Sequence, residues 1–246
     1  MIKAVTFDCW GTLLLDSPAA DEGYRRERLA GMGAVLDQAS VSVTSHHLAQ
    51  AYTMAGRRLA ELWRGHRDLP VLGHVRALLD AIDPALSARL SSAVLDALVD
   101  AYSSPAGRVP PAIDPGATEA LDALSRRGCA LGVVSNVMRT PGVVLRSVLE
   151  GPGLLESFAV LTFSDECGIR KPDPEIFLRT LRHIGVAPEQ AVHVGDDPVL
   201  DVEGARDAGM RVIQVTASGR ATGAVKPDAV VRGLGEVPAV LARLSS

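Results

Sequence analysis

Residues 1–16 read MIKAVTFDCWGTLLLD, and the organisation of the whole chain follows from how this stretch begins. The run Ala4–Phe7 is short and apolar, it ends at Asp8, and Gly11 with Thr12 breaks the pattern soon afterwards. Short apolar runs bounded by turn residues are typical of buried strands. The amino terminus therefore predicts a buried strand, a carboxylate where that strand ends, and a turn.

A helical block follows this first strand. From about residue 21 to residue 103, apolar residues recur at spacings of three and four, as in Leu48, Tyr52, Leu59 and Leu62. After the turn-rich segment VPPAIDPG at residues 109–116, the pattern changes to alternating strands and helices. The predicted strands are CALGVVS (129–135), FAVLTF (158–163), AVHVG (191–195) and MRVIQV (210–215), and the predicted helices cover residues 117–127, 143–150, 174–184 and 199–208.

Alternating strands and helices predict an α/β fold built from βαβ units with a parallel, Rossmann-like sheet. The first strand precedes the helical block and the other strands follow it, so the block is predicted to be an insertion. A distance of about 90 residues between consecutive strands is too long for a simple crossover. We therefore expect a core of residues 1–16 and 104–246 and a helical cap of residues 17–103.

Four of the five predicted strand ends are followed by polar side chains. In open parallel sheets, reactive groups collect outside the carboxyl ends of the strands. Together these side chains offer carboxylates, a hydroxyl, an amide and a cation, which can attack and neutralise a phosphoryl group. The residues are Asp8, Ser135, Asn136, Lys171, Asp196, Asp197 and Asp201.

Each of these residues also has an ordinary structural explanation when it is taken alone. Asp8 could stabilise a turn, Ser135 and Asn136 could cap a helix, and Lys171 could be a solvated surface lysine. Asp197 could cap the helix that Pro198 begins. The functional interpretation rests on the combination and order of the residues.

At this point the sequence resembles the haloacid dehalogenase-like (HAD) hydrolase superfamily. The resemblance covers both ends of the chain, and the helical insertion is similar to the family's C1-type cap. Each motif is short, and their order along the chain makes the resemblance specific. The motifs are FDxxGTL at residues 7–13, VSN at residues 134–136, KP at residues 171–172 and GDxxxxD at residues 195–201.

The resemblance implies a role for each strand-end residue. Asp8 would be the nucleophile that forms a covalent aspartyl intermediate, and Lys171 would offset its charge and that of the substrate. Ser135 and Asn136 would bind the transferring group. The implied ligands of Mg²⁺ are Asp8, Asp196 and the backbone carbonyl of Trp10, with Asp197 and Asp201 around them.

Trp10 departs from the pattern of the family's phosphatases, which usually carry a second Asp two residues after the nucleophile. Indole cannot act as a general acid near neutral pH, and losing that assistance typically costs about 10²–10⁴-fold in rate. An aromatic residue at this position is similar to the metal-independent 2-haloacid dehalogenases. Their fourth motif, however, typically has Ser and Asn where this chain has Asp196 and Pro198.

The acidic fourth motif favours Mg²⁺ and phosphoryl transfer, since Asp196 without a cation would be a like charge beside Asp8. We therefore expect a hydrolase, a Mg²⁺-dependent phosphatase that acts on a small phosphate ester or anhydride. Two alternatives stay open: a 2-haloacid dehalogenase, and a phosphometabolite-binding or regulatory protein with weak catalysis. Trp10 could equally be a wall of the substrate cavity with no effect on the reaction type.

Composition and charge narrow the class of protein further. A formal net charge of −4 argues against nucleic acid as a partner, and no apolar run approaches the length of a membrane span. Three cysteines without CxxC spacing argue against disulfides and zinc, so we expect a cytoplasmic protein. The oligomeric state cannot be predicted. Dispersed histidines are interpreted as structural, as are the arginines of the long cap helix, Arg57, Arg58 and Arg64.

Overall fold

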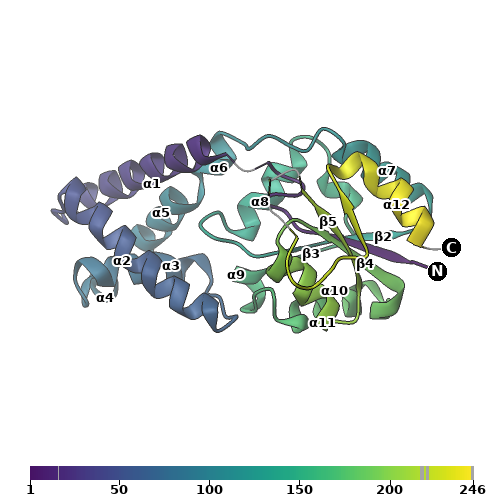
Figure 1. Ribbon diagram of the computed structural model, residues 1–246. Coiled ribbons are helices and arrows are strands. Elements are labelled where there is room, and N and C mark those ends of the chain that lie inside the picture. Colours follow the sequence, from purple (N-terminus) through teal and green to yellow (C-terminus); the bar gives the residue numbers. More distant parts are fainter. Residues whose placement is uncertain (16, 217–218, 220–221, 245–246) are drawn as a thin grey trace.

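The computed structural model describes residues 1–15, 17–216, 219 and 222–244 (Figure 1). The strands are β1 (Ala4–Phe7), β2 (Ala130–Ser135), β3 (Val160–Phe163), β4 (Ala191–Gly195), β5 (Arg211–Val215) and β6 (Ala229–Val231). The helices before β2 are α1 (Pro18–Gln38), α2 (Ser45–Arg64), α3 (Val71–Ile82), α4 (Leu86–Arg89), α5 (Ser92–Ser103), α6 (Pro105–Arg108) and α7 (Ala117–Arg126). Those after β2 are α8 (Gly142–Glu150), α9 (Ser164–Cys167), α10 (Pro174–Ile184), α11 (Gly204–Asp207) and α12 (Val237–Leu244).

Within the described residues, six strands form one parallel sheet in the order β3-β2-β1-β4-β5-β6. The first strand is central because Val5 pairs with Leu131 of β2 on one side and Val192 of β4 on the other. The predicted α/β class and all five predicted strands are confirmed. The sequence analysis missed β6, which has only three residues, pairs only with β5 and leaves Val230 exposed.

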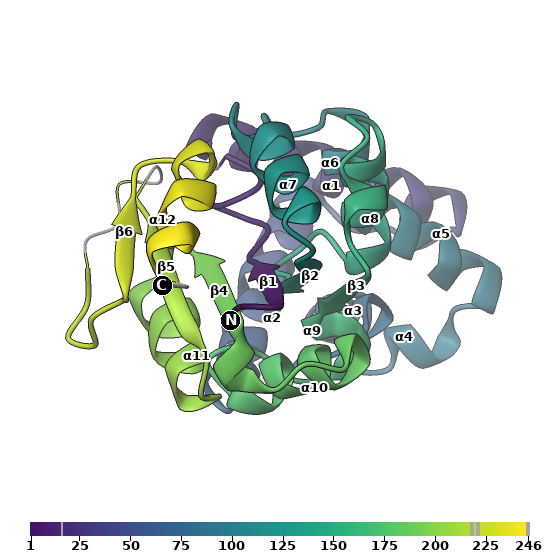
Figure 2. The ribbon, with the colours of Figure 1, turned by 90° about the vertical axis from the view of Figure 1, so that its right-hand side faces the viewer.

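Helices cover both faces of the sheet, as Figure 2 shows. Successive residues of a strand point to opposite faces. Val5 and Phe7 accordingly pack in the same apolar cluster as residues of α7, α8 and α12, whereas Ala4 packs with residues of α10 and α11. This double covering explains why the central strands are continuous apolar runs rather than alternating ones.

The segment between β1 and α7 is helical, and α1, α2, α3 and α5 share an apolar cluster of their own. In Figure 1 these helices lie beside the sheet rather than on its faces. The helical stretch extends slightly further than expected, because α6 ends at Arg108. The division into a core and a cap stays a prediction, and its first boundary touches residue 16, which lies outside the described residues. Across the described ranges, no helix is both long enough and apolar enough to span a membrane.

The chain leaves and re-enters the sheet region along two paired segments. The backbone N–H of Leu15 donates to the carbonyl of Ala112 at 2.8 Å, and that of Asp114 donates to the carbonyl of Leu13 at 2.9 Å. Both segments meet near the end of β1. The helical segment is therefore joined to the sheet at the edge where Asp8 lies.

A second junction, centred on Asp68, lies in the α2–α3 connection and is only 6% exposed. Its carboxylate accepts hydrogen bonds from Ser164 Oγ and Arg170 Nη1, each at 2.5 Å, on the sheet side. On the helical side it accepts one from Trp63 Nε1 at 2.9 Å and lies 3.2 Å from His74 Nε2. This buried ion pair therefore joins the two parts of the chain.

Replacing Asp68 with alanine should lower the free energy of unfolding by about 3–5 kcal/mol at pH 7, because the buried Arg170 guanidinium would lose its counterion. Urea denaturation measures this change. Asp83→Ala, which breaks an exposed ion pair with Arg89, is the matched control and should change stability little.

The effect of Asp68→Ala should also depend on pH. Burial by itself would raise the pKa of Asp68, but the His74 hydrogen bond and the Arg170 charge lower it from 3.8 to about 2. The stabilisation is then complete above the unfolded-state pKa and is lost as the pH falls through the folded-state pKa. The difference between wild type and variant should shrink between about pH 4 and pH 2. A constant difference over that range would contradict a role for the Asp68 charge.

Candidate active site

The carboxyl ends of the central strands bring three of the predicted site residues to one edge of the sheet. Asp8 follows β1, Ser135 is the last residue of β2, and Asp196 follows β4. Because β1 pairs in parallel with both neighbours, these ends lie next to one another. All three residues are at least nine-tenths buried.

Lys171 supplies the positive charge of this edge. Its Nζ atom lies 2.7 Å from Asp8 Oδ1 and 2.6 Å from Asp201 Oδ1, and the side chain is 1% exposed. Burial alone would lower the pKa of Lys171, but the two carboxylates outweigh it and raise the pKa to about 12. The lysine is therefore a fixed cation and not a proton donor near neutral pH, which agrees with the charge-offsetting role expected for it.

The side-chain amide of Asn136 forms two hydrogen bonds with the backbone of Lys171. Asn136 Nδ2 donates to the Lys171 carbonyl at 3.0 Å, and Asn136 Oδ1 accepts from the Lys171 N–H at 2.8 Å. The sequence analysis assigned Asn136 to substrate binding. The observed bonds make it also a positioning residue for Lys171, and it lines the cavity described below, so its role in substrate binding stays a prediction.

Asp201 is held on several sides. Besides Lys171 it contacts His193 Nε2 at 3.1 Å, and its second oxygen accepts from the Asp197 N–H at 2.9 Å. Burial would raise the pKa of Asp201, but the Lys171 charge and the His193 hydrogen bond keep it well below the usual range. A Cβ at Gly195 would lie 2.3 Å from the carboxyl carbon of Asp201, so glycine is required there. Asp201 is thus a fixed anion that orients Lys171.

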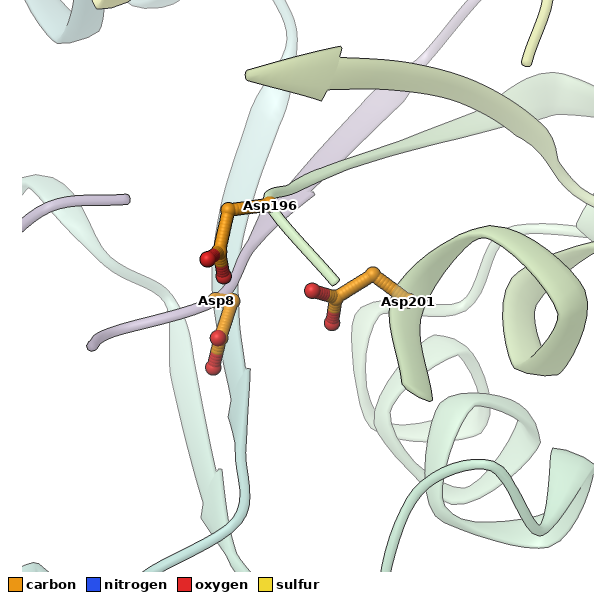
Figure 3. A group of neighbouring side chains, drawn as sticks. All are labelled: Asp8, Asp196 and Asp201. Atoms are coloured by element: carbon orange, nitrogen blue, oxygen red, sulfur yellow. The ribbon is translucent and has the colours of Figure 1, made fainter. Parts of the chain in front are cut away.

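Three carboxylates converge at this edge, as Figure 3 shows. Asp8, Asp196 and Asp201 each place an oxygen within 4.8 Å of the others. Opposite the single Lys171 ammonium, three ionised carboxylates leave a formal charge of −2. Burial raises the pKa of Asp8, the Lys171 charge opposes that rise, and the Asp201 charge adds to it. One ammonium therefore does not neutralise the three carboxylates of Asp8, Asp196 and Asp201.

Asp196 is placed by features of two neighbouring segments. Gly11 has a φ of +76°, and a Cβ there would lie 2.6 Å from Asp196 Oδ2, so both the turn and the close approach require glycine. Gln214, near the end of β5, donates from Nε2 to the Asp196 carbonyl at 3.0 Å. The turn after β1 and the fifth strand therefore both fix the position of this carboxylate.

Asp197 and Ser135 complete the predicted set. Asp197 Oδ1 accepts from the N–H groups of Val199 and Leu200, both at 2.9 Å, so it caps the helical turn that Pro198 begins. The structural interpretation of Asp197 is therefore correct, and its backbone N–H also supports Asp201. The Ser135 hydroxyl lowers the pKa of Asp8. Among the described residues this buried hydroxyl has no hydrogen-bond partner of ordinary geometry, and Ser135 does not line the cavity described below.

A cavity of about 820 Å³ opens onto these carboxylates. Trp10 lines it, as do Asp8, Asn136, Lys171, Asp196 and Asp197. Helix α1 contributes Tyr24, Arg25 and Arg28, helix α2 contributes Tyr52, and the loop after β2 contributes Arg139. Arg57, Arg58 and Arg64 are exposed and do not line this cavity, so their interpretation as a solvated face holds.

The sequence analysis did not identify several of these residues. His193 was interpreted as structural, and it is fully buried between Thr6 and Asp201, where it orients the carboxylate that contacts Lys171. Gln214 was missed, although its place near the end of a strand was a usable signal. Arg28 and Arg139 carried no local signal, because neither lies in a motif or at a strand end.

This arrangement suits nucleophilic attack on an anionic group. Asp8 faces the cavity, the Lys171 ammonium is fixed beside it, and the Ser135 hydroxyl is available nearby. The oxygen atoms of Asp8 and Asp196 are ligands of the kind that a hard divalent cation prefers. The residues present therefore fit Mg²⁺.

Known proteins are similar to this chain over most of its length. A model of the haloacid dehalogenase-like hydrolase family matches residues 2–209. Phosphoglycolate phosphatase from Rhodospirillum rubrum is 32% identical over 213 residues, which cover 87% of this chain and 79% of that protein. Phosphoserine phosphatase from Thermus thermophilus is 46% identical over 90 residues, only 37% of this chain and 35% of that protein.

Structural similarity to solved structures indicates the same family. The crystal structure of a 2-haloacid dehalogenase from Pseudomonas syringae is 30% identical, with a TM-score of 0.72, and the match covers 99% of this chain and 100% of that one. Sequence motifs, sheet order and these similarities therefore agree, and the chain is a hydrolase that belongs to the haloacid dehalogenase-like family.

Proposed function

We propose that this hydrolase is a Mg²⁺-dependent phosphatase that cleaves a small phosphate ester or anhydride through a covalent intermediate on Asp8. The observation that carries the proposal is the convergence of three carboxylates, two of which contact a single buried ammonium. A site with a formal charge of −2 cannot admit a phosphate unless a cation compensates. The phosphatases among its relatives support the same reaction class.

In this proposal, Asp8, Asp196 and the backbone carbonyl of Trp10 would hold Mg²⁺, and Asp197 and Asp201 would lie around them. Asp201 is already bonded to Lys171 and His193, so we assign it an orienting role rather than a ligand role. When bound, the metal would supply positive charge that screens the nucleophile from the phosphate. The remaining chemistry belongs to the side chains.

The proposed reaction has two steps. An Asp8 oxygen attacks phosphorus, the bond from phosphorus to the leaving oxygen breaks, and Lys171 and Ser135 neutralise and hold the phosphoryl oxygens. Water then attacks the aspartyl-phosphate, which releases phosphate and restores the Asp8 carboxylate. The Lys171 charge favours the ionised form of Asp8, because it opposes the effect of burial, which raises the Asp8 pKa.

Trp10 sets the character of the first step. It lines the cavity at the position where a general acid would be expected, and indole cannot protonate a departing alkoxide. The leaving group must then carry its own negative charge. We therefore propose that the substrate is an aryl phosphate, an acyl phosphate or another anhydride.

The rate should depend steeply on the leaving group. Across phosphate monoesters, kcat/KM should fall by about 10²–10⁴-fold from aryl to simple alkyl esters, because that is the range of assistance a general acid supplies. Steady-state phosphate release from both series measures it. Trp10→Asp should restore part of the alkyl activity. Equal turnover of both series by the wild type would contradict the role given to Trp10.

Asp8→Asn should abolish phosphate release, because a neutral amide cannot form the covalent intermediate. Binding of inorganic phosphate, followed by calorimetry, should survive, since Lys171 and Ser135 are retained. Mass spectrometry of quenched wild-type reactions should show phosphate on Asp8. An Asp8→Asn variant with full activity would rule out the covalent mechanism. Phosphate binding without turnover in the wild type would instead favour the alternative that this chain is a phosphometabolite-binding or regulatory protein.

One observation favours a second function, that of a metal-independent 2-haloacid dehalogenase. Trp10 replaces the expected second acid, and the Pseudomonas syringae relative with a TM-score of 0.72 is named a 2-haloacid dehalogenase. In this case Asp8 would attack carbon, the carbon–halogen bond would break to release halide, and water would hydrolyse the resulting ester. Asp196 opposes this proposal, because an extra carboxylate beside Asp8 weakens the nucleophile.

Magnesium should distinguish the two functions. Thermal melts of the wild type should shift upward with Mg²⁺, by the equivalent of about 2.7 kcal/mol at roughly one hundred times the dissociation constant. Asp196→Asn should remove most of this shift, whereas Asp207→Asn, which makes the same charge change at an exposed position, should not. Halide release from 2-chloropropionate in EDTA, with melts indifferent to Mg²⁺, would instead establish the dehalogenase.

We also propose that residues 17–103 form a cap over the site and that the enzyme acts in the cytoplasm. The cap proposal rests on the separate apolar cluster of helices α1, α2, α3 and α5 and on their contribution to the cavity. The location rests on three free cysteines, which suit a reducing compartment. Small anionic molecules are the proposed partners, and nucleic acid and membranes are not.

A further inference from the structure

Two of the arginines that line the cavity come from distant parts of the chain and have no ion-pair partner among the described residues. Arg28 comes from helix α1, and Arg139 comes from the loop between β2 and α8. Arg28 is only 3% exposed, and Arg139 is half-buried. Within the described ranges, neither guanidinium has a carboxylate within 4.0 Å, and the acid that Arg28 influences, Asp21, is largely exposed. Both charges therefore face the cavity without a carboxylate in contact, although Asp21 and Glu22 also line the cavity.

Aromatic rings and neutral acceptors hold both arginines in place. Arg28 Nε donates to the Tyr102 carbonyl at 2.5 Å, its Nη1 donates to the Tyr52 hydroxyl at 3.3 Å, and its guanidinium lies 5.0 Å from the Tyr102 ring centre. The Arg139 guanidinium lies 5.0 Å from the Tyr52 ring centre and 5.6 Å from that of Trp63. Tyr52 is thus contacted by both positive charges.

Helix α2 is shaped to receive Arg139. A Cβ at Gly56 would lie 2.8 Å from Arg139 Nη2, so the absence of a side chain makes room for the guanidinium. Glycine in a helix interior is destabilising relative to alanine. Its presence in α2 is therefore explained by the close approach of Arg139.

Neutral partners compensate a buried cation only in part. A guanidinium has five N–H donors, and the hydrogen bonds of Arg28 to Tyr102 and Tyr52 use two of its nitrogens. Burying an unpaired charge costs several kcal/mol, and two like charges at one aromatic ring also repel each other. An anion between Arg28 and Arg139 would remove both costs, and the planar donors of arginine suit carboxylate and phosphate.

The same cavity contains Asp8, Lys171 and the two arginines, and its volume of about 820 Å³ suits a small metabolite. We propose that the physiological substrate carries a second acidic group, a carboxylate or a phosphate, which Arg28 and Arg139 bind while the scissile phosphate lies at Asp8. This inference rests on the proposed phosphatase function. It makes the two arginines the residues that select the substrate.

Matched aryl phosphates test this proposal. We would compare 3-carboxyphenyl phosphate with 3-carbamoylphenyl phosphate, which has nearly the same shape and no charge, and with the bisphosphate of 3-hydroxyphenol. A second set of substrates, with one methylene before the acidic group, tests a longer distance between the scissile phosphate and that group. Wild-type kcat/KM should be about 10- to 100-fold higher for an acidic member than for its amide. The acidic substrate with the higher kcat/KM shows whether the site prefers a carboxylate or a phosphate as the second group.

Variants separate substrate binding from a structural role. Arg139→Gln should reduce the preference for the acidic substrate to near unity by raising its KM, while the amide keeps its kcat/KM. Arg139→Lys should restore part of the preference. Arg146→Gln is the matched control, because Arg146 also stacks on a ring, that of Phe163, but lies outside the cavity. Equal losses for both substrates in Arg139→Gln would make Arg139 a structural link and overturn the proposal.

A binding measurement keeps this proposal distinct from the proposed function. Asp8→Asn protein titrated with the same compounds should show a lower Kd for the acidic member, followed by the fluorescence of Trp10 and Trp63, which lie at the cavity and beside Arg139. If phosphate is released equally from both members, the second-anion inference is wrong and the phosphatase function stands. If no compound is hydrolysed, the proposed function fails, and equal Kd values would overturn this inference as well.

Discussion

The ammonium group of Lys171 lies between Asp8 and Asp201 in a region that is almost closed to water, and the surrounding structure keeps it there. Charges removed from water each cost several kcal/mol unless they are paired with good geometry. Asn136 therefore holds the Lys171 backbone by two hydrogen bonds, and His193 holds Asp201. Thr6 in turn contacts His193, so the central strands set the position of the charge.

Two consecutive residues connect the active site to the helical segment. Arg170 pairs with Asp68 in the α2–α3 connection, and Lys171 pairs with Asp8 at the end of β1. Helical residues also line the cavity that opens onto Asp8. A displacement of the helical segment would therefore disturb the Arg170–Asp68 ion pair and also move part of the cavity wall. Because Lys171 directly follows Arg170, the position of the helical segment is coupled to the position of the Lys171 ammonium.

Most of the fold and the centre of the site could be predicted from sequence because their signals are local. Buried strands appear as apolar runs, and parallel pairing brings strand ends such as Asp8, Ser135 and Asp196 to one edge. The short edge strand β6 was missed because three residues give no periodicity. The apolar pattern likewise could not show which face of α1 lines the cavity, since that depends on how α1 packs on the sheet segment.

The sequence by itself determined the α/β class, the position of the helical insertion and the hydrolase family, because these depend on periodicity and on motifs a few residues long. Only the tertiary structure decided that Asn136 supports Lys171, 35 residues away, and that Asp68 pairs with Arg170, 102 residues away. It also decided that Arg28 and Arg139 face one cavity. Partners this far apart in the chain leave no local pattern, since their proximity follows from the packing of whole elements.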